Sequence, residues 1–275
     1  MQKQKCLKEW RNLKSMLEFN EFLSVLEKFA PLSLSKLMIE NGSYDNSGAI
    51  IKCSNQVNKI LFSLDLSSAS VEKAISEKCD TIVTHHPAIY NPIKSLSIDG
   101  ETAPLVNAIK NGINVISMHL NLDIADEGID QALARALGCK KARIVGLVDD
   151  KHGYGREFDC GLGIDEFVEL IKENLKTEKV IVYGQGVCNK VASFCGGGAS
   201  EALEKVLGGK TSADTVVTSD VSHHHVKELI EKNIKLIIIP HYSAEDYGFN
   251  KFYTSVKEEI SSVAGALYYQ DKRFM

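Results

Sequence analysis

Two short segments of this chain carry the same pair of chemical groups at the same spacing. His119 is followed four residues later by Asp123, and His241 is followed four residues later by Glu245. Each segment comes directly after an apolar, β-type run, so each places an imidazole and a carboxylate at the carboxyl end of a predicted strand, where open α/β sheets build their sites. Either pair alone would fit an ion pair or a helix cap, but the repetition favours a common site.

A third segment adds two more imidazoles. His85 and His86 stand before Pro87, just after the apolar run that ends at Val83. Alone, such a pair would fit one buried and one exposed structural histidine. With the other segments it brings the donors to four histidines and two carboxylates, a mixture that suits zinc, iron or manganese rather than calcium. Six donors exceed the needs of one tetrahedral ion, so we predict two divalent ions bridged by a carboxylate and a water or hydroxide.

Two other motifs leave alternatives open. The glycines at 196–198 lie between a predicted strand and a predicted helix. Their backbone N–H groups could bind an anion at the helix N-terminus, or they could form a tight turn with Ser200 as the helix cap. In the run His223-His224-His225, we expect His224 to face the site as a proton donor or substrate ligand and its neighbours to lie at the surface. The chain has no Ser-His-Asp elbow and no Cys-His nucleophile pattern.

Composition excludes several classes of partner. A chain of 275 residues with 44% hydrophobic and 25% charged residues is typical of a soluble globular protein. Its net charge of -4 gives no electrostatic footprint for nucleic acid, and no apolar run reaches the length of a membrane span. The first sixteen residues are basic but lack an apolar signal core, which favours a surface helix over a transit peptide. We therefore expect neither nucleic acid nor a membrane as a partner.

The cysteines indicate a compartment. Seven cysteines are scattered along the chain without a C-x-x-C pair. An odd, unpatterned set fits free thiols in a reducing environment and excludes a structural zinc finger. We predict a cytoplasmic protein.

The order strand, helix, strand, helix, strand occurs twice. In the first copy the predicted strands are residues 59–65, 79–84 and 113–117, and the helices are 70–78 and 104–111. In the second copy the strands are 190–195, 213–218 and 234–240, and the helices are 200–207 and 226–232. The middle strand of both copies contains Asp-Thr-[Ile/Val]-Val-Thr. The pattern predicts an α/β fold with two similar α/β lobes from an internal duplication and the metal site in the crevice between them.

The remaining segments complete this organisation. We predict further helices over residues 127–138, 165–174 with Asp165 as N-cap, and 250–264. The stretch from 139 to 161 shows no clear periodicity. The approximate lobes are therefore 40–138 and 160–249, joined by 139–159, within a single domain over 1–275.

Six blocks of sequence resemble a known family. They are Tyr44-Asp-Asn-Ser-Gly48, Val83-Thr-His-His-Pro87, Met118-His-Leu-Asn-Leu-Asp123, Gly196-Gly-Gly198, Thr218-Ser-Asp220 and His241-Tyr-Ser-Ala-Glu245. Together they resemble the GTP cyclohydrolase 1 type 2 family, often called the Nif-three-like proteins, over most of the chain. Tyr44 stands where this family usually has Trp, and Leu120 where Thr is common; neither change removes a metal donor.

The resemblance implies a specific set of roles. The metal ligands would be His85, His86, Asp123, His241 and Glu245. Glu245 would bridge the ions, and His119 would orient Asp123 or the bound water. The resemblance also implies ring-like homo-oligomers, commonly hexamers, and a purine nucleotide substrate whose imidazole ring is opened.

We therefore predict a dinuclear metal-dependent hydrolase of a small molecule, with His119 and His224 moving protons; the resemblance implies a nucleotide. GTP cyclohydrolase I-type ring opening is the version that the resemblance implies. A metal-dependent phosphoesterase or amidohydrolase would need the same ions. The alternative from another class is a non-catalytic metal-binding or regulatory assembly protein, because no nucleotide-specific motif is present.

Overall fold

The computed structural model describes residues 17–197 and 199–275, and it divides into two compact units. Unit 1 comprises the chain up to Lys28, Asn46–His119 and Tyr253–Tyr269. Unit 2 comprises Phe29–Asp45, Leu120–Phe252 and Gln270–Met275. Both units are therefore assembled from segments far apart in the sequence. The helix predicted within the first sixteen residues lies outside the described part of the chain.

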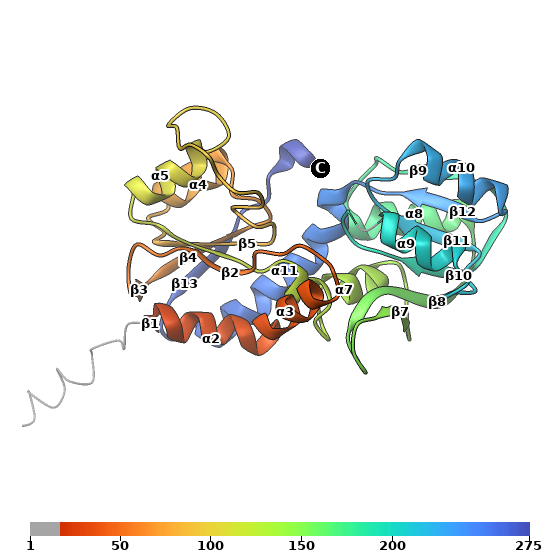
Figure 1. The fold of residues 1–275 in the computed structure, drawn as a ribbon, viewed down its shortest axis with the longest axis horizontal. Coiled ribbons are helices and arrows are strands. Elements are labelled where there is room, and N and C mark those ends of the chain that lie inside the picture. Colours follow the sequence, from red (N-terminus) through yellow and green to blue (C-terminus); the bar gives the residue numbers. More distant parts are fainter. Residues whose placement is uncertain (1–16, 198) are drawn as a thin grey trace, which may run out of the picture. The chain divides into compact units, whose positions relative to one another are not determined.

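Unit 1 is built on a five-stranded sheet (Figure 1). Its strand order is β13 (Gly265–Tyr268), β4 (Lys59–Ser63), β5 (Thr81–Thr84), β6 (Asn114–Ser117) and β2 (Gly48–Ile51). The first four strands are parallel, and β2 pairs antiparallel with β6 at the edge. Unit 1 also contains the short antiparallel pair β1 (Leu17–Glu18) and β3 (Gln56–Val57), and most of α2 (Phe19–Phe29).

Two crossover helices cover one face of this sheet. They are α4 (Ser68–Ser76) and α5 (Ala103–Lys110), which pack against each other (Figure 1). Their apolar sides meet the sheet in a cluster that includes Leu61, Val71, Ile82 and Leu105. The strands β5 and β6 are buried at every residue, as expected for parallel strands inside an α/β layer.

Unit 2 contains a six-stranded sheet. Its order is β7 (Arg143–Leu147), β8 (Gly153–Gly163), β10 (Val187–Ser193), β11 (Thr215–Thr218), β12 (Lys235–Ile238) and β9 (Ile181–Tyr183). Within this sheet the neighbours β10 and β11, and β11 and β12, pair in parallel, and the other neighbours pair antiparallel. The helices α7 (Ile129–Ala136) and α8 (Ile164–Leu175) pack on β8 and β10, while α10 (His223–Glu231) packs on α9 (Ala199–Leu207) and β12.

Four further helical segments complete the chain. In unit 2 these are α3 (Leu32–Glu40), the single turn α6 (Leu120–Asp123) and the 3-10 turn η1 (Lys272–Phe274). The long helix α11 (His241–Ile260) begins in unit 2 and passes into unit 1 at Tyr253. There the Tyr253 ring packs 5.3 Å from the rings of both Phe62 and Tyr268.

The expected α/β class and the six strands of the two βαβαβ runs are confirmed, and four local predictions are wrong. The stretch 139–161, predicted to be irregular, contains β7 and most of β8. The helix predicted to begin at residue 250 begins at His241. Asp165 lies in the first turn of α8, whose N-cap is Gly163. The helix after the glycines, α9, begins at Ala199, so Ser200 lies within the helix and not at its N-cap.

Matching hydrogen bonds hold the middle strand of each βαβαβ run. In unit 1 the Asp80 carboxylate accepts from the Asn58 side chain at 2.9 Å and from the Thr81 hydroxyl at 3.1 Å. In unit 2 the Asp214 carboxylate accepts the equivalent bonds, at 2.8 Å in both cases, from Asn189 and Thr215. The same three residue types therefore join the first and second parallel strands in each unit.

Neither a disulfide nor a membrane-spanning helix occurs in the described part of the chain. Its six cysteines are all free thiols. Among residues 17–197 and 199–275, no helix combines the length and the apolarity needed to cross a bilayer.

Candidate metal centre

The paired histidines of unit 1 lie where the chain turns after β5. The backbone N–H groups of His85 and His86 both donate to the Leu64 carbonyl, at 3.1 and 2.9 Å. This turn breaks the alternation of an extended strand, so both rings lie together, with their centroids 4.9 Å apart. His85 is fully buried, and about a quarter of the His86 side chain is exposed.

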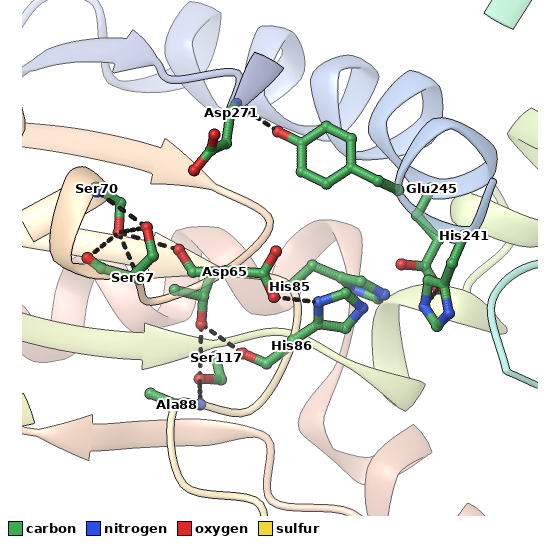
Figure 2. Close-up of polar contacts among 12 residues, drawn as sticks. Asp65, Ser67, Ser70, His85, His86, Ala88, Ser117, His241, Glu245 and Asp271 are labelled. Carbon is green, nitrogen blue, oxygen red and sulfur yellow. Dashed lines mark hydrogen bonds and ion pairs between the residues drawn. The ribbon is translucent and has the colours of Figure 1, made fainter. Parts of the chain in front are cut away.

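Hydroxyl groups at the strand ends hold the loop that carries these histidines (Figure 2). The Thr84 hydroxyl donates to the His86 carbonyl at 2.8 Å and contacts the Ser117 hydroxyl at 2.8 Å. Ser117 in turn accepts from the Ala88 N–H at 3.0 Å. Because β5 and β6 are parallel neighbours, the polar residues at their carboxyl ends fix the loop to the sheet.

The Nδ1 atoms of both rings have partners on the protein. His85 Nδ1 lies 2.9 Å from the Met118 carbonyl oxygen. His86 Nδ1 lies 2.7 Å from a carboxylate oxygen of Asp65 (Figure 2). A carbonyl can only accept, so Nδ1 of His85 carries a proton. In the neutral ring, Nε2 then presents a lone pair, as a metal-binding imidazole must. A carboxylate or carbonyl behind the ring is the usual arrangement for histidine ligands of metals.

The position of Asp65 follows from the start of α4. Ser67 and Ser70 form a capping box at the N-terminus of this helix. The Ser70 hydroxyl also contacts the Asp65 carbonyl at 3.1 Å, which holds the residue at the end of β4 (Figure 2). A local sequence signal for a helix start therefore also places the partner of a site histidine.

The third histidine of unit 1 joins the same group. His119 follows β6, and its backbone N–H donates to the Ser47 hydroxyl at 3.0 Å. Its ring centroid lies 5.3 Å from that of His85 and 6.1 Å from that of His86. The Tyr90 ring meets His119 edge-on at 6.4 Å. Unit 1 thus brings three imidazoles together at the carboxyl ends of two adjacent strands.

Unit 2 carries the second histidine-carboxylate pair on the first turns of α11. His241 and Glu245 lie four residues apart on one helix face, with Nε2 and Oε1 separated by 3.0 Å. His241 Nδ1 contacts a carboxylate oxygen of Asp220 at 2.5 Å. Glu245 is only 3% exposed, so this carboxylate is directed into the protein.

Asp123 lies in the single helical turn α6 and is 4% exposed. The Cys195 thiol donates to one of its carboxylate oxygens, with 3.6 Å between sulfur and oxygen. Burial raises the pKa of Cys195 well above its ordinary value, and the charges of Asp123 and Asp130 raise it further. The thiol therefore keeps its proton at neutral pH and acts as a donor.

The residue after Cys195 lies against the other ligand pair. Gly196 has a φ of +58°, and a Cβ added there would lie 2.2 Å from Glu245 Oε1 and 3.3 Å from His241 Nε2. Only glycine permits both this backbone conformation and this close approach. The segment Cys195-Gly196 therefore contacts Asp123 through its thiol and approaches Glu245 through its backbone.

Each predicted site residue can now be placed. Unit 1 groups His85, His86 and His119; unit 2 places Asp123, His241 and Glu245 around Cys195-Gly196. His224 is exposed in the first turn of α10, where its described contacts are with Ser222 and His225. Its predicted proton-transfer role remains a prediction.

Sequence reasoning missed the carboxylates behind the imidazoles. Asp65 and Asp220 each stand two residues beyond the last residue of a parallel strand, β4 and β11 respectively. Residues at this position reach the carboxyl edge of the sheet, so the position itself was a usable signal. The contribution of Cys195 depends on a contact with Asp123 across 72 positions of sequence, which no local pattern encodes.

The donor chemistry of this structure fits a transition-metal ion. Histidines and carboxylates that could bind metal ions occur in each unit taken by itself: His85, His86 and His119 in unit 1, and Asp123 and Glu245 in unit 2. Such nitrogen and oxygen donors suit zinc, iron or manganese. Three of the site imidazoles have Nδ1 engaged by an oxygen, which orients Nε2 for binding.

Comparison with known proteins identifies the family. Residues 17–269 match the model of the Duf34/NIF3 (NGG1p interacting factor 3) family. The chain belongs to this family. The match spans both compact units and includes every ligand candidate named above.

Individual proteins are also similar to this chain. The chain is 28% identical over 238 residues to a "GTP cyclohydrolase 1 type 2 homolog" of Clostridium acetobutylicum, covering 83% of this chain and 85% of that protein. It is 29% identical to "NGG1-interacting factor 3" of Saccharomyces cerevisiae, covering 75% and 80%. The crystal structure of a Staphylococcus aureus hypothetical protein matches the fold with a TM-score of 0.81 at 22% identity, covering 94% and 97%.

Proposed function

We propose that this protein is a dinuclear metal-dependent hydrolase. Its ligands would be His85 and His86 from unit 1 with Asp123, His241 and Glu245 from unit 2, and Glu245 would bridge the ions. The observation that carries the proposal is the oxygen atom behind Nδ1 of His85, His86 and His241. Structural histidines need no such uniform arrangement, whereas metal ligands are oriented by it.

The chemistry follows from this ligand set. When bound, two adjacent divalent ions would supply an acidified water and stabilise negative charge on the substrate. His119 lies beside the two ligand histidines of unit 1 and would transfer the proton. His224 is the second proton carrier of the proposal. Its exposed place on α10 gives it access to solvent.

The proposed substrate class rests on the relatives. A protein 28% identical to this chain bears the name "GTP cyclohydrolase 1 type 2 homolog", which supports a purine nucleotide whose imidazole ring is opened by hydrolysis. A phosphoester or an amide would be attacked by the same activated water, so these are the other substrates to test.

A second candidate function is a metal-binding assembly protein without turnover. The observation in its favour is the name of a relative that is 29% identical, "NGG1-interacting factor 3", which describes an interaction rather than a reaction. In this version the same donors would stabilise a docking surface.

The deciding experiment compares Glu245→Gln with Glu258→Gln. Glu258 is an exposed residue of the same helix, so its change controls for the loss of one charge on α11. Elemental mass spectrometry of the wild type, purified without chelator, should give about two transition-metal equivalents per chain. GTP, phosphoesters and amides are then offered to the metal-loaded protein. The hydrolase proposal expects turnover that E245Q abolishes and E258Q keeps.

The other outcomes separate the two candidates. Metal content without turnover of any of these substrates would favour the assembly protein. A chain that binds no zinc, iron or manganese would exclude both. Hydrolysis of another substrate without GTP turnover would remove only the cyclohydrolase version.

We further propose that the two βαβαβ runs arose by internal duplication, with the metal site in the crevice between the lobes 40–138 and 160–249. The duplication is supported by the matching Asn, Asp and Thr contacts at the start of the middle strand in each unit. The resemblance supports a homo-oligomer, commonly a hexamer. The free thiols support a reducing, cytoplasmic environment.

A further inference from the structure

The segment Cys195-Gly196 is held rigidly by buried polar contacts within unit 2. The Cys195 N–H donates to one oxygen of the Asp130 carboxylate at 3.3 Å. The Tyr154 hydroxyl donates to the Cys195 carbonyl. Asp130, Tyr154 and Cys195 are at most 7% exposed, so these bonds are shielded from water.

The anchor of this segment is itself fixed. The second oxygen of Asp130 accepts from the Gly155 N–H at 2.7 Å and from the Arg156 guanidinium at 2.8 Å. A fully buried carboxylate with an ion pair and two backbone donors has one preferred orientation. The position of Cys195 is therefore determined by β8 and α7.

We propose that Cys195-Gly196 is the positioning element for the carboxylate ligands of unit 2, with the Cys195 thiol orienting Asp123 and the Gly196 backbone limiting the position of Glu245. The thiol fixes one oxygen of Asp123 by its hydrogen bond at 3.6 Å. Gly196 leaves space for Glu245 Oε1 that any side chain would fill. This inference rests on the proposed metal site.

The first test measures metal affinity by competition with a chromophoric zinc chelator, using the full chain. Cys195→Ala removes the donor, and Cys195→Ser keeps a hydroxyl donor at the same position. Loss of an outer partner of a ligand typically weakens metal binding by about 10- to 100-fold, so we expect this loss for C195A and a smaller one for C195S. Cys188→Ala is the matched control, because Cys188 is also fully buried in unit 2 and lies in β10.

The second test concerns the glycine. Gly196→Ala places a methyl group on Glu245 Oε1 and should abolish tight zinc binding. Gly209→Ala is its control, since Gly209 has a similar φ of +70° but no heavy atom within 4 Å of the added Cβ. The control shares the backbone strain, so a selective loss in G196A would arise from the contact with Glu245.

Three outcomes would overturn the inference. If the wild type binds zinc and C195A binds it as tightly, the thiol does not position Asp123, while the proposed metal site stands. If C195A and C188A lose zinc affinity equally, the loss comes from a general change in core packing and not from the contact between the thiol and Asp123. A sulfur-to-metal charge-transfer band in the cobalt-loaded wild type would make Cys195 a ligand. A wild type that binds no metal would instead remove the proposed function itself.

Discussion

Three imidazoles of the candidate site share one local arrangement, with an oxygen acceptor at Nδ1. For His86 and His241 that acceptor is a carboxylate, from Asp65 and Asp220 respectively. A negative oxygen fixes the ring and makes its opposite nitrogen a better donor to a metal. Asp65 and Asp220 therefore contribute to binding without being ligands.

Replacing either carboxylate by an amide should weaken metal binding. Asp65→Asn and Asp220→Asn each keep the side-chain size but remove the charge behind the ring. We expect zinc affinity to fall by about 10- to 100-fold, measured by chelator competition. Asp99→Asn, at an exposed position of unit 1, is the control. Unchanged affinity in D65N and D220N would show that the imidazoles are oriented by other contacts.

The candidate ligands were accessible from sequence because they follow apolar strands directly. His85, His119 and His241 each stand within three residues of a strand end, so their places at the carboxyl ends of strands could be predicted. Their orientation could not, because it depends on the Met118 carbonyl and on carboxylates from neighbouring strands. The hydrogen bond from Cys195 to Asp123 depends on tertiary packing, so it could not be predicted from the sequence either.

At the scale of secondary structure, too, some features could be predicted from the sequence and others could not. Strands β4, β5, β6, β10, β11 and β12 are short apolar runs and were predicted. Strand β8 was missed because it is rich in glycine and carries Arg156 and Glu157, charges that a strand inside a sheet rarely holds. In the structure Asp130 pairs with Arg156, and Thr211 and Arg143 contact Glu157, which makes the burial possible.

The Asp130–Arg156 pair joins α7 to β8 and should be costly to break. Both side chains are at most 3% exposed. Arg156→Met would leave the carboxylate buried without its cation, and such losses typically cost about 3–5 kcal/mol. Urea unfolding should show this decrease. Arg135→Met is the control, because its pair with Glu127 is exposed and should contribute at most about 1 kcal/mol. Equal effects of R156M and R135M would contradict the assignment.

The Asp214 carboxylate, which directly precedes β11, makes the stability of the fold depend on pH under acidic conditions. Burial alone would raise the pKa of Asp214, but hydrogen bonds from Asn189, Thr215 and the strand amides lower it from 3.8 to about 2. Because the folded-state pKa is the lower one, the charge stabilises the fold above about pH 4, and this contribution is lost as the pH falls towards about 2.

The variant Asp214→Asn tests this directly. It cannot titrate, so the wild type should exceed it in urea midpoint near neutral pH, and the difference should shrink between about pH 4 and about pH 2. A difference that stays constant over this range would show that the hydrogen bonds, rather than the charge, are responsible.

For the whole molecule, metal binding should raise thermal stability. The ligand side chains lie close together only in the folded chain, so unfolding destroys the binding site. A free metal ion at a concentration 100 times its Kd therefore adds about 2.7 kcal/mol to the free energy of unfolding. Adding zinc to chelator-treated protein should therefore raise the Tm, and the rise should be smaller for His85→Ala. An equal rise in the variant would place the bound ion elsewhere.

The distribution of thiols supplies a natural probe of each unit. Cys79 is buried in unit 1, where burial raises its pKa to about 11, and Cys195 is buried in unit 2, where burial also raises its pKa. Neither forms a reactive thiolate in the folded chain, whereas Cys53 is exposed. Alkylation followed by peptide mass spectrometry should label Cys53 before Cys79 and Cys195. The later labelling of Cys79 and Cys195 would then time the opening of unit 1 and unit 2 separately, without any engineered reporter.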